Sequence, residues 1–162
     1  MEKLTLTDVR NLIISIIICQ ASGLIGTIFT ADAIPTWYAT LNKPVFTPPN
    51  WLFGPVWTTL YTLMGISAFL VWRRGLDEQK VRIGMIFFAI QLLLNGLWTP
   101  IFFGLKELFA ALIIIIILWI TILLTIISFS RISLTPGILL MPYIAWVSLA
   151  TALNYAIFVL NP

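Results

Sequence analysis

Long apolar stretches alternate with short polar turns along the whole chain. Each stretch is close to the roughly 20 residues that a helix needs to cross the hydrocarbon core of a bilayer. The pattern predicts an all-α membrane protein, a five-transmembrane-helix bundle forming one domain over residues 1–162. A long structured loop is expected between the first and second helices. The expected spans are residues 9–29, 55–72, 81–103, 107–129 and 136–160.

The segment between the first two spans is rich in aromatic residues and proline, and it reads WYATLNKPVFTPPNWLFGPVW at residues 37–57. Disordered segments have the opposite composition, with few aromatics and much charge. Each proline fixes its own φ angle and restricts the residue before it. We therefore expect a stiff aromatic cover over whatever the helices enclose. The second helix is expected to begin at Pro55, because proline is favoured in a first helical turn.

Three features of the spans affect how the helices pack. Ser15, Cys19 and Gly23 recur every fourth residue on the first span, and small residues at this spacing let two helices approach closely in lipid. The partner is either another helix of the same chain or a second copy. Pro100 predicts a kink or an early stop in the third span. The fourth span is apolar all round, so it should face lipid and neighbouring helices.

Composition and charge narrow the class of protein. The chain is 60% hydrophobic and 9% charged, with a mean hydropathy of +1.06. A water-soluble fold of this composition would expose large apolar patches on its surface. Away from their ends the spans contain no Asp, Glu, Lys or Arg. Buried charges mark ion and proton pathways, so their absence argues against a pump or an ion-coupled transporter, although not against passage of an apolar molecule.

The basic residues lie in short loops, which indicates topology rather than a nucleic-acid partner. Lys43 and Lys106 fall on one side of the membrane. By the positive-inside rule the other side is cytoplasmic. We expect an integral protein of a bacterial cell membrane, with the N-terminus in the cytoplasm and the aromatic loop and C-terminus outside. The cytoplasmic set is Lys3, Arg10, Arg73, Arg74, Lys80, Arg82 and Arg131.

The chain contains no histidine. This removes the usual general base, the commonest axial ligand of haem and the commonest transition-metal ligand. We expect no metal site and no required cofactor.

Polar and aromatic residues share a face on two of the spans. Asn95 and Trp98 do so on the third, with Gln91 and Phe102 at helical spacing. The fifth span places Tyr143, Trp146, Ala150, Leu153 and Asn154 in a similar pattern. Amides in hydrocarbon are costly unless they are hydrogen-bonded, so both faces should point into the bundle. Either the asparagines only bridge helices and the aromatics fill the core, or both faces line an apolar small-molecule site.

Three segments resemble the signature blocks of the TspO/MBR family, the tryptophan-rich sensory proteins related to the mitochondrial translocator protein. They are the aromatic segment at residues 37–57, NGLWTPIFFG at 95–104 and PYIAWVSLATALNY at 142–155. The resemblance covers nearly the whole chain. It implies a five-helix bundle, usually a homodimer, with a pocket under the first loop. Members bind porphyrins, notably protoporphyrin IX, and also benzodiazepine-type and isoquinoline carboxamide drugs, and bacterial members are linked to light-dependent porphyrin breakdown.

With this resemblance, the two faces and the loop predict a set of ligand-binding residues. Trp51 and Trp146 are the indoles expected to take part in oxidative chemistry. The basic residue that completes the sterol motif of animal members does not follow Tyr155. The predicted ligand-binding residues are Thr27, Thr30, Trp37, Tyr38, Pro48, Trp51, Phe53, Gly54, Asn95, Trp98, Tyr143, Trp146, Ala150, Leu153 and Asn154.

The leading hypothesis is a membrane receptor and sensor that binds protoporphyrin IX and promotes its light-dependent oxidative degradation. The macrocycle would stack on Trp51, Trp98 and Trp146. Without histidine, metal-free porphyrin should be preferred over haem. A passive carrier of tetrapyrroles or other lipophiles is the alternative, and a signalling scaffold is a third possibility.

Overall fold

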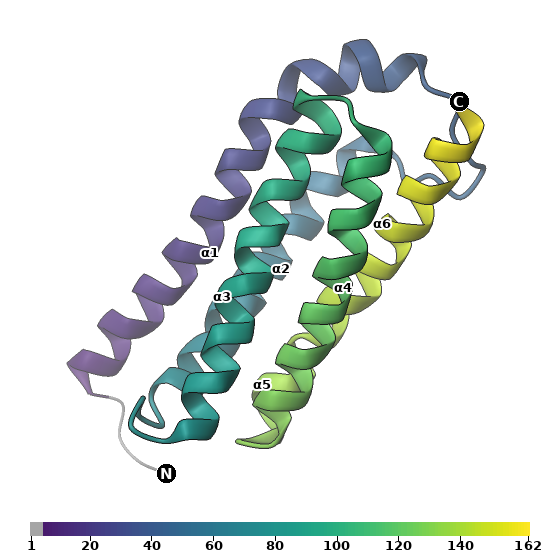
Figure 1. The fold of residues 1–162 in the computed structure, drawn as a ribbon. Coiled ribbons are helices and arrows are strands. Elements are labelled where there is room, and N and C mark those ends of the chain that lie inside the picture. Colours follow the sequence, from purple (N-terminus) through teal and green to yellow (C-terminus); the bar gives the residue numbers. More distant parts are fainter. Residues whose placement is uncertain (1–4) are drawn as a thin grey trace.

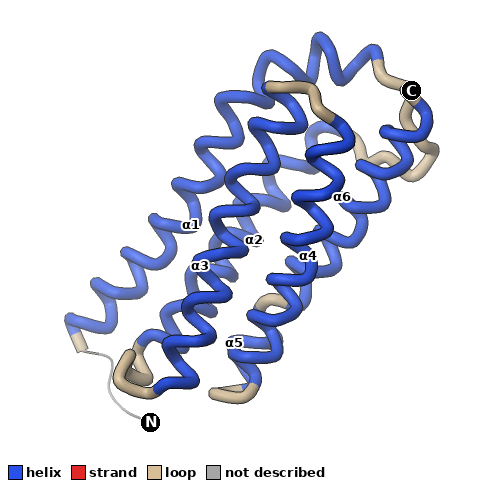
Figure 2. Tube along the Cα trace, in the orientation of Figure 1, coloured by secondary structure: helices blue, strands red, loops and turns tan. Residues whose placement is uncertain are grey.

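The computed structural model describes residues 5–162, and its spanning helices lie side by side in one bundle (Figures 1 and 2). Five helical stretches are long and apolar enough to cross a membrane, and the described residues contain no strand. The predicted all-α, five-span architecture is confirmed. The helices are α1 Leu6–Ala33, α2 Asn50–Trp72, α3 Gln79–Thr99, α4 Leu108–Ser130, α5 Leu134–Leu139 and α6 Met141–Leu160, with π-helical segments η1 Ile34–Tyr38 and η2 Pro100–Gly104.

The first helix begins at a capping box. The backbone N–H of Asp8 donates to Thr5 Oγ1 at 3.2 Å, and the backbone N–H of Thr5 donates to Asp8 Oδ2 at 2.9 Å. Two donors at the helix start are thereby satisfied. Asp8 Oδ1 also lies 3.8 Å from Arg73 Nε, so the start of α1 is linked to the end of α2.

The first helix is longer than the sequence predicted, and the loop is shorter. Helical structure continues past residue 29 through η1, so Trp37 and Tyr38 lie on a helix rather than in a loop. The expected helix start at Pro55 is wrong, because α2 already begins at Asn50. Gly54 precedes that proline and lacks the Cβ that would clash in a helical conformation. Within the expected loop, only residues 41–49 are not helical.

The other prolines mark breaks in the spans. The α-helical part of the third span ends at Thr99, and the chain continues from Pro100 to Gly104 as a π-helix, so at that proline the helix changes type instead of stopping early. The last span is divided at Leu140 into α5 and α6. Pro142 lies in the first turn of α6, where the missing N–H has no intrahelical partner.

The small residues of α1 pack within the chain. Ser15 and Cys19 are buried, and a Cβ on Gly23 would overlap the ring of Tyr61. This supports the intrachain interpretation of the stripe. The opposite face of α1 is exposed, and it carries Ile13, Ile14, Ile17, Ile18, Leu24, Ile25 and Ile28.

Helix α4 packs mainly against α3 and α6. One of its faces is buried through Ile115, Leu118 and Ile122. Phe129 near its end stacks on Phe88 of α3 with ring centroids 5.8 Å apart. Five other isoleucines are exposed, so α4 does face both neighbouring helices and the bilayer. They are Ile113, Ile116, Ile117, Ile120 and Ile127.

The short loop is tied to the end of α6, where the two segments meet near the C-terminus in Figure 1. The backbone N–H of Asn42 donates to Asn161 Oδ1 at 2.9 Å, and Asn161 Nδ2 donates back to the Asn42 carbonyl at 3.0 Å. Lys43 Nζ donates to the carbonyl oxygens of Tyr38 and Leu41 at 2.7 and 2.9 Å. We call residues 41–49 the strap, because they join η1 to α2 and are bonded to the end of α6 through Asn42.

Candidate functional site: a chamber below aromatic helix ends

A chamber of about 320 Å³ lies between α1, α2, α3 and α6, below η1 and η2. Its volume falls at the lower end of the roughly 300–1,000 Å³ typical of small-molecule sites. None of its lining residues is charged. The lining residues are Gln20, Gly23, Leu24, Gly26, Thr27, Thr30, Ile34, Tyr38, Asn50, Phe53, Gly54, Trp57, Thr58, Tyr61, Trp98, Thr99, Phe102, Phe103, Trp146, Ala150, Leu153 and Asn154.

The chamber is closed at one end by the two π-helical segments, which we call the roof. Trp37 of η1 meets Phe102 of η2 edge-on at 5.8 Å, and Tyr38 meets Phe103 at 5.6 Å. Trp98 stacks on Phe102 from below at 5.0 Å. A π-helical turn is wider than an α-helical turn and is frequent at functional sites. Both segments have proline at their start, so the roof depends on local departures from α-helical geometry.

One wall of the chamber is an aromatic face of α2. Phe53, Trp57 and Tyr61 follow at spacings of four, so they lie above one another on the helix. Trp57 stacks on Tyr61 with ring centroids 5.3 Å apart and 26° between the planes. Phe53 meets Trp146 of α6 edge-on at 5.7 Å. Three aromatic side chains of α2 and one of α6 thus form an apolar surface that suits a flat ring system.

A chain of hydrogen bonds runs behind this wall through the buried core. Tyr61 Oη donates to Asn95 Oδ1 at 2.5 Å, and Asn95 Nδ2 donates to Tyr143 Oη at 3.0 Å. Tyr143 Oη in turn donates to Gln91 Oε1 at 2.8 Å. Asn95 and Tyr143 therefore join α2, α3 and α6 and do not line the chamber. For Asn95 the bridging interpretation is confirmed.

Asn154 both bridges helices and lines the chamber. Its Oδ1 accepts a hydrogen bond from Trp98 Nε1 at 3.1 Å, and its Nδ2 donates to the Leu108 carbonyl at 3.1 Å. These bonds hold the Trp98 indole in one orientation at the chamber wall. Here the two interpretations of the sequence are both correct, because one amide fixes an aromatic ring and also borders the cavity.

The other polar side chains of the wall are largely bonded to the protein itself. Gln20 Nε2 donates to the Thr58 carbonyl and to Thr62 Oγ1, each at 3.0 Å. Thr27 and Thr30 donate to carbonyl oxygens of their own helix. Tyr38 Oη has no hydrogen-bond partner among residues 5–162. Because most donors are already occupied, the chamber is suited to an apolar ligand with few polar groups.

Most of the predicted ligand-binding residues meet at the chamber. Five others lie elsewhere. Trp37 belongs to the roof, Pro48 to the strap, and Asn95 and Tyr143 to the buried chain of hydrogen bonds, while Trp51 is 72% exposed. The predicted residues that do line the chamber are Thr27, Thr30, Tyr38, Phe53, Gly54, Trp98, Trp146, Ala150, Leu153 and Asn154.

Trp57 takes the place that the sequence analysis gave to Trp51. Trp51 lies in the first turn of α2, six residues before Trp57, so at 3.6 residues per turn the two side chains point in different directions. The sequence analysis treated this segment as a loop, whereas α2 already includes it. The spacing of Phe53, Trp57 and Tyr61 was a signal that could have identified the correct face. Other lining residues that were missed are Gln20, Gly23, Leu24, Gly26, Ile34, Asn50, Thr58, Tyr61, Thr99, Phe102 and Phe103.

Comparison with known proteins agrees with this architecture. The model of the TspO/MBR family matches residues 15–160. The chain belongs to the TspO/MBR family. It is 46% identical to the tryptophan-rich protein TspO of Archaeoglobus fulgidus over 154 residues, which are 95% of this chain and 99% of the relative.

Two further TspO/MBR relatives come from distant sources. The tryptophan-rich protein TspO of Chlorobaculum tepidum is 43% identical over 155 residues, 96% of this chain and 98% of that protein. The translocator protein of Homo sapiens is 37% identical over 134 residues, 82% of this chain and 79% of that protein. Family membership and the five apolar helices together make this an integral membrane protein.

Proposed function

We propose that this TspO/MBR protein is a membrane receptor and sensor for tetrapyrroles that binds protoporphyrin IX in the chamber. The observation that carries the proposal is the meeting of Trp57, Trp98 and Trp146, from three different helices, at one uncharged cavity. A flat macrocycle gains about 0.5–1.5 kcal/mol from each favourable aromatic contact beyond the burial of its area. The same walls would accept benzodiazepine-type and isoquinoline carboxamide drugs.

The absence of histidine from the chain supports a preference for metal-free porphyrin. Haem iron bound here would lack its commonest axial ligand. Protoporphyrin IX needs no such ligand, because stacking and apolar burial supply its binding free energy. The expected result is tighter binding of protoporphyrin IX than of haem, measured by titration of the same preparation.

We further propose that bound protoporphyrin IX is degraded in the light. The porphyrin is then both chromophore and substrate, and the electrons that reduce dioxygen come from its ring. The nearby indoles of Trp57 and Trp146 either donate an electron to the excited porphyrin and recover it, or are themselves oxidised. The lining residues include no carboxylate, histidine or lysine, so conventional acid–base groups are not part of the proposal. Trp51 was expected in this role from the sequence, but its side chain is 72% exposed and does not line the chamber, so the proposal assigns the role to Trp57.

The proposal is tested by adding protoporphyrin IX to the purified protein in lipid nanodiscs. Saturable quenching of tryptophan fluorescence in the dark, followed by loss of the porphyrin absorption bands under light and oxygen, is expected. Turnover in the dark, or unchanged turnover in Trp146→Phe, would refute the photochemical part. Porphyrin flux across liposomes that contain the protein would show a carrier, whereas binding without flux supports a receptor.

We also propose a homodimer in the membrane, as the resemblance implies. The exposed apolar face of α1, with Ile17 and Ile28 on it, is available to a second copy because the small-residue face is used inside the chain. Ile17→Trp should weaken such a dimer, and cross-linking in nanodiscs of controlled stoichiometry would measure this. A dimer that survives the substitution unchanged would place the interface on another face.

A further inference from the structure

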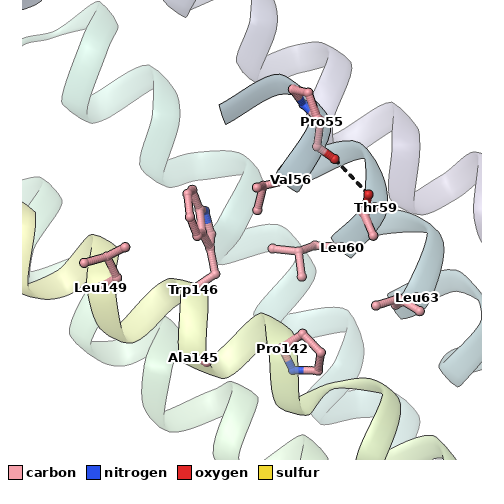
Figure 3. A pocket seen from close by; sticks show the side chains of 9 residues that line it. All are labelled: Pro55, Val56, Thr59, Leu60, Leu63, Pro142, Ala145, Trp146 and Leu149. Carbon is pink, nitrogen blue, oxygen red and sulfur yellow. Dashed lines mark hydrogen bonds between the residues drawn. The ribbon is translucent and has the colours of Figure 1, made fainter. Parts of the chain in front are cut away.

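A second hollow lies on the outside of the bundle, between α2 and α6 (Figure 3). It has a volume of about 680 Å³ and is open along one side. We call it the outer groove. Both of its helices are membrane spans, so the groove opens to lipid. Its lining residues are Pro55, Val56, Thr59, Leu60, Leu63, Pro142, Ala145, Trp146 and Leu149.

The surface of the outer groove is apolar. The one hydroxyl among its lining residues, Thr59 Oγ1, donates to the Pro55 carbonyl of its own helix at 2.9 Å. This bond, drawn in Figure 3, satisfies the hydroxyl within α2. A molecule in the groove would therefore be held by apolar contacts, as expected for a compound already dissolved in the bilayer.

Trp146 belongs to the outer groove and to the chamber. Figure 3 shows its side chain rising from α6 toward Val56 of α2. On the chamber side its ring meets Phe53 edge-on at 5.7 Å. One indole thus lies between a lipid-facing hollow and the internal cavity.

This indole packs against the core by apolar contact, whereas two other indoles that border α6 are also hydrogen-bonded. Trp98 and Trp119 each donate a hydrogen bond, to Asn154 at 3.1 Å and to Ser148 at 2.8 Å. The Trp146 N–H has no hydrogen-bond partner among residues 5–162. The edge-on contact with Phe53 contributes only about 0.5–1.5 kcal/mol. Rotation of this side chain would therefore break no hydrogen bond.

The roof borders one end of the chamber through contacts among Trp37, Tyr38 and Phe102, and the strap is bonded to Asn161 at the end of α6. The backbone beside the outer groove is less regular. Pro55 interrupts the hydrogen-bond ladder of α2, and the last span is broken at Leu140, two residues before Pro142.

We propose that the outer groove is a binding site for flat, apolar aromatic molecules dissolved in the bilayer, and that Trp146 turns aside to pass them into the chamber. The inference rests on the proposed ligand-binding function and adds the route by which the ligand passes from the bilayer into the chamber. A ligand is favoured as the occupant over a lipid chain or a second copy, because the groove and the chamber share one aromatic wall, the indole of Trp146.

The test is kinetic and uses protoporphyrin IX transferred from loaded liposomes to the full-length protein in nanodiscs. Ala145 is exposed and lines the outer groove but not the chamber. Ala145→Phe should slow both association and dissociation of the porphyrin about tenfold. The Kd should stay within about twofold of wild type, because blocking the route changes the rates of binding and release but not the affinity of the chamber. Ala89, on the exposed surface of α3 and in neither cavity, supplies the matched control Ala89→Phe, which should keep wild-type rates.

A second variant from the opposite helix, Leu63→Trp, should slow the exchange as well. Wild-type rates in both groove variants would overturn the inference. A change in oligomeric state with unchanged rates would also overturn it and would show that the groove contacts a second copy. If the wild-type protein binds no porphyrin, the proposed function itself fails. If the wild-type protein binds porphyrin and the groove variants exchange it at wild-type rates, only the proposed route is refuted and the proposed function stands.

Discussion

Trp57 stacks on Tyr61 at 5.3 Å, and the hydroxyl of the same tyrosine donates to Asn95. The indole at the chamber wall is thus supported by a ring that is itself fixed by a buried amide. Tyr143 lies at the far end of this arrangement and meets Trp57 edge-on at 6.3 Å. The contacts join the apolar wall of the chamber to the polar chain in the core, so the position of Trp57 depends on α3 and α6 as well as on α2.

The first prediction separates Trp57 from Trp51. Trp57→Phe should weaken protoporphyrin IX binding by about 0.5–1.5 kcal/mol, roughly twofold to tenfold in Kd, because one stacking surface is reduced. It should also slow light-dependent loss of the porphyrin. The matched variant Trp51→Phe changes a side chain that is 72% exposed and should behave as wild type. Fluorescence titration and illuminated absorption spectra measure both properties, and a stronger effect at Trp51 would contradict the assignment.

The second prediction concerns the centre of the polar chain. Tyr143→Phe removes the hydroxyl that donates to Gln91 and accepts from Asn95. Two buried amide groups are then left without this partner, which should lower the free energy of unfolding by about 1–3 kcal/mol. Unfolding in mixed detergent micelles measures the change. Tyr155→Phe is the control, because that side chain is exposed, and equal effects at both positions would argue against the buried chain.

The third prediction tests the close approach of α1 and α2. A Cβ on Gly65 would lie 2.6 Å from Ile16 Cα, a backbone atom that cannot move alone. Gly65→Ala should therefore destabilise the protein by about 1–3 kcal/mol through overpacking. A Cβ on Gly96 would meet only Ser22 Oγ, at 3.1 Å, and that hydroxyl can rotate. Gly96→Ala should cost less, and thermal unfolding of both variants in one detergent decides the comparison.

The fourth prediction concerns orientation in the membrane. The excess of lysine and arginine on one side leads us to expect the strap outside the cell and the turn between α2 and α3 in the cytoplasm. The native thiol of Cys19 is buried, so it should not interfere with labelling. An impermeant maleimide should label Val45→Cys in intact cells and Asp77→Cys only after permeabilisation. The reverse pattern would invert the topology.

Sequence reasoning was most successful for the properties that hydrophobicity determines. The number of spans follows from the length of the apolar stretches, because a bilayer leaves few alternatives to complete helices. The inward direction of Trp98 and Asn154 follows from the cost of polar groups in hydrocarbon. The signature segments predicted the part of the chain that borders the chamber, including Ala150 and Leu153.

No comparable signal in the sequence indicated the two π-helical segments. The first helix was expected to end at residue 29 and the second to begin at Pro55, whereas the first continues through η1 and the second begins at Asn50. This displaced the expected wall residue from Trp57 to Trp51. The outer groove could not be predicted from the sequence either, because it depends on the distance between α2 and α6 and on the rotamer of Trp146.

The most direct test of the chamber is to fill it. Ala150 lines the cavity on α6, and a large ring at this position would occupy the space proposed for the macrocycle. We expect Ala150→Trp to weaken the binding of protoporphyrin IX in the dark by about tenfold or more, with unchanged affinity in Ala89→Phe and an unaltered melting temperature in both. Wild-type affinity in Ala150→Trp would contradict the account, because the porphyrin would then bind outside the chamber.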